Sequence, residues 1–287
     1  MRTGRVLFLL LCLRLTVQGQ EIPHPLAKVD VCEKFSNAVV RIQTGRPSHG
    51  TGFIVSQDGW ILTASHVVLD WTTGEYDGAI TVILPDNSTQ LATPILKADH
   101  FLILRDFAIL KIDKNNLPFL TLGDEDQAAI GSDVSIIGFP ISAQSRFEQF
   151  VTTKFCLFGS IAARQTFPID KINVEAIYFQ GVSVKGISGA PLISLKTGKV
   201  IGIANLKLAG INDALKAEEA TLGNPSAGGL FVGDVSVQKT VADVIDTLDR
   251  HLANGLGAAT GINDAKYALA KAQRNYKKEN RNAATHN

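Results

Sequence analysis

A long succession of short apolar runs separated by turn residues, from about Ala38 to Val237, constrains the fold more than any other feature. Representative runs are 38–42, 52–55, 59–63, 107–112, 134–139 and 199–203. Turn sequences such as Gln57-Asp58-Gly59 stand between them. Short runs of this kind, without intervening helical patterns, are typical of antiparallel strands in a barrel or sandwich. We therefore predict an all-β fold for this part of the chain.

Composition narrows the class of protein. With 45% hydrophobic residues and a formal net charge of +1, the chain is not of the disordered type, which has low hydrophobicity and high net charge. The near-neutral charge also argues against a generally basic nucleic-acid-binding domain. The charge is unevenly placed, because residues 251–287 are basic and the middle of the chain is acidic. An electrostatic partner would therefore engage this tail, although a solvated helical face is the simpler explanation of its charge.

The N-terminus has the pattern of a secretory signal peptide over residues 1–19. Arg2 and Arg5 precede an apolar stretch, 6–13, and small residues at Val17 and Gly19 offer a cleavage site. The alternative is a retained anchor. No later stretch approaches 18 uninterrupted apolar residues, so we expect no stable membrane span after signal cleavage and a secreted or periplasmic location.

Two further features concern the ends of the mature chain. Helical spacing appears late, over Ser236–Leu252 and again over Asn263–Arg281, where we expect a helix or a frayed tail. Cys32 and Cys156 remain after signal cleavage, and they form either one disulfide or two buried thiols. The sequence has no CxxC motif and its histidines are scattered, so we expect no metal ion and no cofactor.

Three short sequence segments contain the candidate catalytic residues, and these strings are centred on His66, Asp106 and Ser188. A serine is a poor nucleophile unless a base lies within hydrogen-bond reach, and the base needs an acid to orient it. Histidine titrates near neutral pH, and a buried aspartate holds its productive tautomer. Glycines beside the serine allow a sharp turn whose N–H groups can face a developing oxyanion. Each string is weak alone, but their order on an all-β background predicts a catalytic triad.

These strings resemble the trypsin-like serine peptidases of the chymotrypsin fold, and most closely the HtrA/Deg-type branch. The matching segments are Gly50-Thr51-Gly52-Phe53-Ile54-Val55, Thr63-Ala64-Ser65-His66-Val67-Val68, Asp106-Phe107-Ala108-Ile109-Leu110-Lys111 and Gly186-Ile187-Ser188-Gly189-Ala190-Pro191-Leu192. The resemblance implies two six-stranded antiparallel β-barrels with a C-terminal helix. It implies that His66 and Asp106 come from the first barrel and Ser188 from the second, and that the N–H groups of Gly186 and Ser188 form the oxyanion hole.

The resemblance also implies a domain plan. We expect a signal peptide over 1–19, an N-terminal segment over 20–35, a peptidase domain over 36–250 split near 125, and a basic helical or disordered tail over 251–287. That tail is too short for the PDZ domain of HtrA-type proteins. Ile187 stands where the family usually has Asp or Asn, so we expect no zymogen activation through that position. Substrate-binding residues are expected at Val182, Asn205 and Leu206, with a small or medium apolar P1 side chain.

The function predicted on this basis is that of an exported serine endopeptidase acting on proteins or peptides through an acyl-enzyme. The alternative is a catalytically silent binding module on the same fold, suggested by the unusual Ile187. An α/β-hydrolase is a third hypothesis, since Gly186-Ile187-Ser188 is superficially similar to a nucleophile elbow. That fold requires the order serine, acid, histidine, and a helix directly after the serine. The sequence leaves the oligomeric state open.

Overall fold

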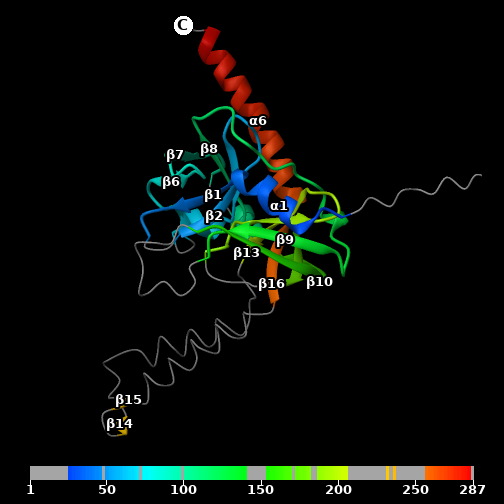
Figure 1. Ribbon diagram of the computed structural model, residues 1–287. Coiled ribbons are helices and arrows are strands. Elements are labelled where there is room, and N and C mark those ends of the chain that lie inside the picture. The colour runs from blue at the N-terminus through cyan, green and yellow to red at the C-terminus, as the bar shows by residue number, and fades with distance from the viewer. Residues whose placement is uncertain are drawn as a thin grey trace, which may run out of the picture.

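The computed structural model describes residues 25–46, 49–70, 73–97, 100–140, 153–169, 172–181, 186–205, 231–232, 235–236 and 256–285. Within these ranges the chain forms two closed antiparallel barrels (Figure 1). The strands of the first barrel, in spatial order, are β1 Val39–Gln43, β2 His49–Ile54, β3 Trp60–Thr63, β8 Ala108–Ile112, β7 Thr89–Pro94 and β6 Ile80–Ile83. Those of the second are β10 Phe155–Ile169, β11 Ile172–Gln180, β16 Leu256–Gly261, β13 Val200–Asn205, β12 Pro191–Ser194 and β9 Asp133–Gly138. The predicted fold class is confirmed.

Short elements join and cover these strands. They are α1 Lys28–Phe35, η1 Ser36–Ala38, α2 Ser65–Val68, α3 His100–Arg105 and η2 Glu125–Gln127, the pair β4 Leu69–Asp70 and β5 Glu75–Tyr76, and the pair β14 Phe231–Val232 and β15 Val235–Ser236. The connection from β8 to β9 contains residue 125, near which the sequence predicted the division between barrels.

The core explains why so many strands are continuous apolar runs. In β8, Ala108, Leu110 and Ile112 belong to a cluster of first-barrel residues, whereas Ile109 belongs to a cluster shared by both barrels, α1 and α6. In the second barrel, Leu192 belongs to an interior cluster, whereas the next residue on the strand, Ile193, belongs to the shared cluster. Both faces of these strands are therefore covered, so alternation of apolar and polar residues is lost.

The C-terminal region differs from the prediction. We expected the domain to end at residue 250, but β16 lies between β11 and β13 and helps close the second barrel. The helix α6, Ile262–Thr285, then packs on the shared cluster through Ile262, Ala265, Leu269 and Ala272. Residues 251–287 are thus not simply a tail. The helix expected over 236–252 lies outside the described residues, apart from Ser236 at the end of β15.

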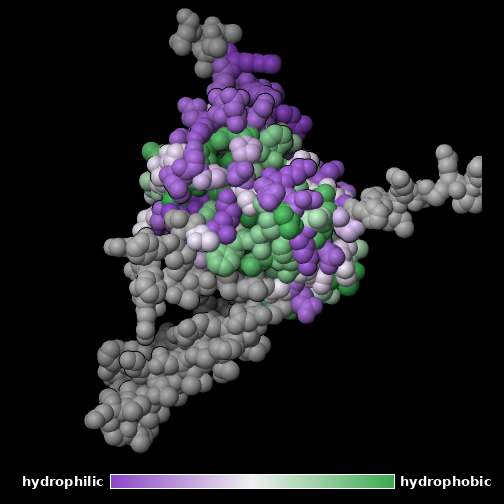
Figure 2. Space-filling view, viewed as in Figure 1, coloured by the Kyte–Doolittle hydropathy of each residue, from purple (hydrophilic) through white to green (hydrophobic). Residues whose placement is uncertain are grey.

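The outer end of α6 projects past the barrels (Figure 1) and is covered by hydrophilic side chains (Figure 2). Its basic residues in this part, from Arg274 to Arg281, are exposed. Among the helices in the described ranges, none is both long and apolar enough to cross a membrane.

A disulfide fastens α1 to the second barrel. Cys32 of α1 bonds to Cys156 of β10, with the two Cα atoms 5.8 Å apart. Of the two possibilities that the sequence left open, the structure has the bonded pair. Because the link spans 124 residues of sequence, it restricts the unfolded chain strongly.

Candidate active site

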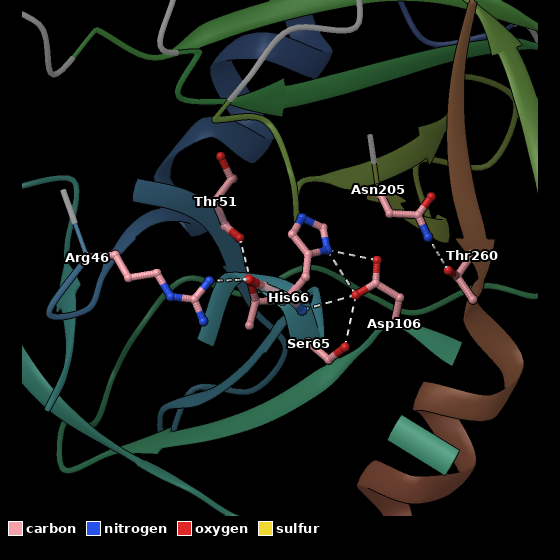
Figure 3. A network of polar contacts seen from close by, with 8 residues as sticks. Arg46, Thr51, Ser65, His66, Asp106, Asn205 and Thr260 are labelled. Carbon is pink, nitrogen blue, oxygen red and sulfur yellow. Dashed lines mark hydrogen bonds and ion pairs between the residues drawn. The ribbon is translucent and has the colours of Figure 1, made fainter. Parts of the chain in front are cut away.

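His66 lies in α2, directly after β3, and its backbone is held in place by Arg46. The Arg46 guanidinium donates to the carbonyl oxygen of His66 at 3.3 Å (Figure 3). It also donates to the carbonyl oxygen of Leu69 (2.5 Å) and forms an ion pair with Asp77. The carbonyl groups at the end of a helix carry partial negative charge, so a cation there is stabilising. The His66 ring is therefore presented from a fixed turn, with its side chain about a quarter exposed.

Asp106 faces His66 from the start of β8. Its carboxylate oxygens lie 2.9 Å from Nδ1 of His66, and the carboxylate also accepts hydrogen bonds from the Ser65 hydroxyl (2.9 Å) and the backbone N–H of His66 (3.1 Å) (Figure 3). The residue is 5% exposed, and its backbone has a φ of 48°, in the left-handed region. Strained backbone of this kind is concentrated at functional sites.

These contacts determine the protonation of the pair. Burial alone would raise the pKa of Asp106, but the charge and hydrogen bonds of His66, with the Ser65 hydroxyl, hold that pKa below its ordinary value. Asp106 is therefore ionised at neutral pH. An ionised carboxylate on Nδ1 favours the tautomer in which Nδ1 carries the proton and Nε2 can accept one.

Ser188 lies in a tight turn between β11 and β12, and this turn is fastened to the first barrel. The N–H of Thr51, in β2, donates to the carbonyl of Ser188 (2.8 Å), and its hydroxyl donates to the carbonyl of Gly186 (2.7 Å). The same hydroxyl accepts from the N–H of Phe139, at the end of β9 (3.0 Å). Thr51 thus joins the serine turn to both barrels.

Gly189 allows the turn to approach the segment that carries His66. Its φ is +84°, and a Cβ placed there would lie 2.1 Å from the carbonyl oxygen of Thr51, 2.3 Å from the hydroxyl of Thr63 and 2.9 Å from the N–H nitrogen of Ala64. Ala64 is two residues before His66. The turn that carries Ser188 and the segment that carries His66 therefore pack directly against each other.

The two backbone N–H groups predicted to form the oxyanion hole belong to the same turn. Within the described part of the chain, the N–H groups of Gly186 and Ser188 donate to no backbone carbonyl, whereas the Ile187 carbonyl accepts from Ala190 (2.8 Å). The Ile187 side chain is 1% exposed and packs in the interior cluster of the second barrel. The residue directly before Ser188 is therefore held in the interior of the second barrel by apolar packing.

The predicted substrate-binding residues are only partly described. Asn205 ends β13, and its side-chain amide donates to the Thr260 hydroxyl of β16 at 2.6 Å (Figure 3). That amide is therefore engaged in a cross-strand contact. Val182 and Leu206 lie outside the described residues.

Sequence reasoning named His66, Asp106 and Ser188 as the triad, but it assigned no role to the residues that contact them. Thr51 and Ser65 stand inside the matched strings, so their positions beside Gly50 and His66 were a usable signal. Arg46 lies 20 residues before His66 in an unremarkable turn. Its role depends on how β1 and α2 are placed in space, which local sequence does not reveal.

Comparison with known proteins agrees with this geometry. The family model for the trypsin-like peptidase domain matches residues 50–203, more than half of the chain. These residues include His66, Asp106 and Ser188 and their strands. The chain therefore belongs to the trypsin-like peptidase family, and the fold expected of an α/β-hydrolase is excluded by its two antiparallel barrels.

Individual relatives are of the DegP/HtrA type. A probable periplasmic serine endoprotease DegP-like of Halomonas elongata is 37% identical over 160 residues, covering 55% of this chain and 29% of the relative. Serine protease HTRA1 of Xenopus laevis is 34% identical over 219 residues, covering 70% and 44%. The chain thus spans less than half the length of these two relatives.

Solved structures share the fold at lower identity. The serine endoprotease from Yersinia pestis superposes with a TM-score of 0.55 at 21% identity, covering 88% of this chain and 68% of that one. The HtrA-type protease AlgW, solved with a tripeptide, gives a TM-score of 0.55 at 21% identity, covering 85% and 62%.

Proposed function

We propose that this protein is an exported serine endopeptidase with His66, Asp106 and Ser188 as its catalytic triad. The observation that carries the proposal is the contact of Nδ1 of His66 with both oxygens of a buried Asp106, beside a serine turn fastened to the same barrel. Relatives named as serine proteases support the same activity.

The reaction follows from the roles of these groups. The Ser188 Oγ attacks the carbonyl carbon of the scissile peptide bond and transfers its proton to Nε2 of His66. Asp106 stabilises the resulting imidazolium, and the N–H groups of Gly186 and Ser188 bind the oxyanion. Collapse of the tetrahedral intermediate breaks the C–N bond, and His66 protonates the leaving amine. Water, deprotonated by His66, then attacks the acyl carbon, the bond from that carbon to the Ser188 Oγ breaks, and His66 returns the proton to Oγ as the acid product leaves.

Location and substrate are further parts of the proposal. We infer a signal peptide over 1–19 and a secreted or periplasmic protein, supported by the N-terminal pattern and by relatives named periplasmic. Protein or peptide substrates are inferred, with Val182, Asn205 and Leu206 contributing to a pocket for a small or medium apolar P1 side chain.

The test compares wild type with Ser188→Ala on unfolded casein and on a peptide library. We expect Ser188→Ala to abolish cleavage. Ser194→Ala is the matched control, because Ser194 is buried six residues further on and its hydroxyl makes no hydrogen bond within the described part of the chain. It should cleave at the wild-type rate. Cleavage by Ser188→Ala as fast as wild type would overturn the proposal, and inactivity of all three folded proteins would favour a binding module.

A further inference from the structure

Arg105, the residue before Asp106, reaches the second barrel. One guanidinium nitrogen donates to the carboxylate of Asp264, in the first turn of α6, and to the backbone carbonyl of Asn173 in β11 at 3.2 Å. The Arg105 side chain is 10% exposed, whereas that of Asp264 is 42% exposed. Arg105 thus binds two elements that belong to, or follow directly from, the second barrel.

The side chains of the neighbouring residues Arg105 and Asp106 contact different partners. Arg105 ends α3, and Asp106, with its left-handed φ of 48°, lies in the short connection between α3 and β8. Asp106 then contacts His66 while Arg105 contacts Asp264 and Asn173. A left-handed backbone at a residue other than glycine persists only where its surroundings hold it. Arg105 supplies a contact on one side of this residue, and His66 with Ser65 supplies contacts on the other.

The partner of Arg105 is itself fixed. The first turn of α6 is tied to the connection between the barrels, because Glu125 accepts from the N–H of Asn263 (2.9 Å) and the Asn263 side-chain amide donates to the Asp124 carboxylate (3.1 Å). The helix follows β16 without a break, so Asp264 moves with the second barrel. An arginine held by Asp264 is therefore held by the barrel that carries Ser188.

We propose that Arg105 is a positioning residue for the proteolytic reaction. By binding Asp264 and the Asn173 carbonyl, it sets the position of Asp106, and through it His66, relative to Ser188 in the other barrel. The inference rests on the proposed function and adds to it a residue that touches neither substrate nor reacting atoms. Both contacts come from one terminal NH2 group of the guanidinium, whose planar geometry fixes the directions of its two N–H donors, whereas a lysine ammonium is a compact charge on a flexible stem.

The experiment measures kcat and KM for a peptide substrate in wild type, Arg105→Gln, Asp264→Asn and the double variant. We expect Arg105→Gln to lower kcat by about tenfold to hundredfold, as misplacement of reacting groups by about 1 Å does, with KM nearly unchanged. Asp264→Asn should lower kcat less. The double variant should be no slower than Arg105→Gln, because both changes remove the same contact. Arg105→Lys should restore only part of the rate.

Lys266→Ala is the matched control, because it removes another contact of the same helix turn and leaves Arg105 untouched. Its kcat should equal that of wild type. A second readout is the proton resonance of the His66 Nδ1–H, which should shift or broaden in folded Arg105→Gln and stay unchanged in Lys266→Ala. This resonance reports the His66–Asp106 contact even if a variant is too slow to assay.

The outcomes separate this inference from the proposed function. If wild type neither cleaves peptides nor reacts at Ser188, the proposed function fails. If wild type is active but Arg105→Gln keeps its kcat and its His66 resonance, the positioning role is overturned. Equal losses of kcat in Lys266→Ala and Arg105→Gln would also overturn it, because loosening of α6 would then explain both.

Discussion

Asp106 combines a left-handed backbone with a carboxylate that accepts hydrogen bonds from His66 and Ser65. Its φ of 48° is one of three positive values among described residues other than glycine, and the other two belong to asparagines, Asn87 and Asn116. Aspartate and asparagine tolerate this conformation better than most residues. Aspartate, the residue type that the proposed chemistry needs, is therefore also one that can adopt the left-handed backbone conformation at this position.

The low pKa of Asp106 predicts a pH-dependent contribution to stability. Since the folded state favours its ionised form, its contribution to the free energy of unfolding is complete above about pH 5 and is lost as the pH falls toward and through the lower folded value. The stability gap between wild type and Asp106→Asn should therefore narrow on acidification from about pH 5 to about pH 3. Urea unfolding followed by tryptophan fluorescence measures it. A gap that widens with acid would contradict the prediction.

The backbone at Gly189 gives a second prediction for a single residue, the effect of a substitution by alanine, and Gly131 provides a matched comparison. Both have a φ of +84°, but a Cβ at Gly131 would meet nothing within 4 Å, whereas one at Gly189 would clash with Thr51 and Thr63. Gly131→Ala should cost about 1–2 kcal/mol for the backbone alone. Gly189→Ala should cost more and abolish activity, because the serine turn must move. Denaturant unfolding and peptide hydrolysis test the pair, and equal effects would refute the steric argument.

At the scale of elements, α6 is anchored by a narrow apolar face. Leu269 is 6% exposed in the shared cluster, while Tyr267, two residues earlier, is 69% exposed. Leu269→Ala should lower the free energy of unfolding by about 2–5 kcal/mol, the range for a buried leucine. Tyr267→Ala should change it by less than about 0.5 kcal/mol. Comparable losses in the two variants, measured by urea unfolding, would mean that the helix does not pack as described.

The link between α1 and β10 predicts sensitivity to reductant. Reduction of Cys32–Cys156 should lower the free energy of unfolding by about 2–4 kcal/mol, because the unfolded chain loses a long-range constraint. The double variant Cys32→Ser/Cys156→Ser should be less stable than oxidised wild type and unaffected by reductant. Unfolding with and without dithiothreitol gives the comparison. Wild type that is equally stable in both conditions would contradict the pairing.

β16 shows why part of the fold could not be predicted. Its sequence is rich in glycine and alanine, which have low strand propensity, yet it forms a strand between β11 and β13. A Cβ at Gly257 would lie 2.2 Å from the Phe179 ring, so a small residue is required there. The glycine therefore meets a packing requirement, which becomes visible only when the neighbouring strand is in place.

Across the whole molecule, features that depend on a short stretch of sequence could be predicted, whereas contacts between residues far apart in sequence could not. The strand-rich class and the strings around His66, Asp106 and Ser188 were predicted because each is local and contiguous. The Arg105–Asp264 contact joins residues that are far apart in sequence, and no local sequence pattern indicates it. The account of the site depends on both kinds of information.

The central claim is that Ser188 is a nucleophile activated by His66. Labelling with an active-site fluorophosphonate, mapped by mass spectrometry in wild type and His66→Ala, tests it most directly. We predict stoichiometric labelling of wild type at Ser188 and loss of that labelling in folded His66→Ala. A folded wild type that is unlabelled at Ser188, or labelling that persists unchanged in His66→Ala, would contradict the account.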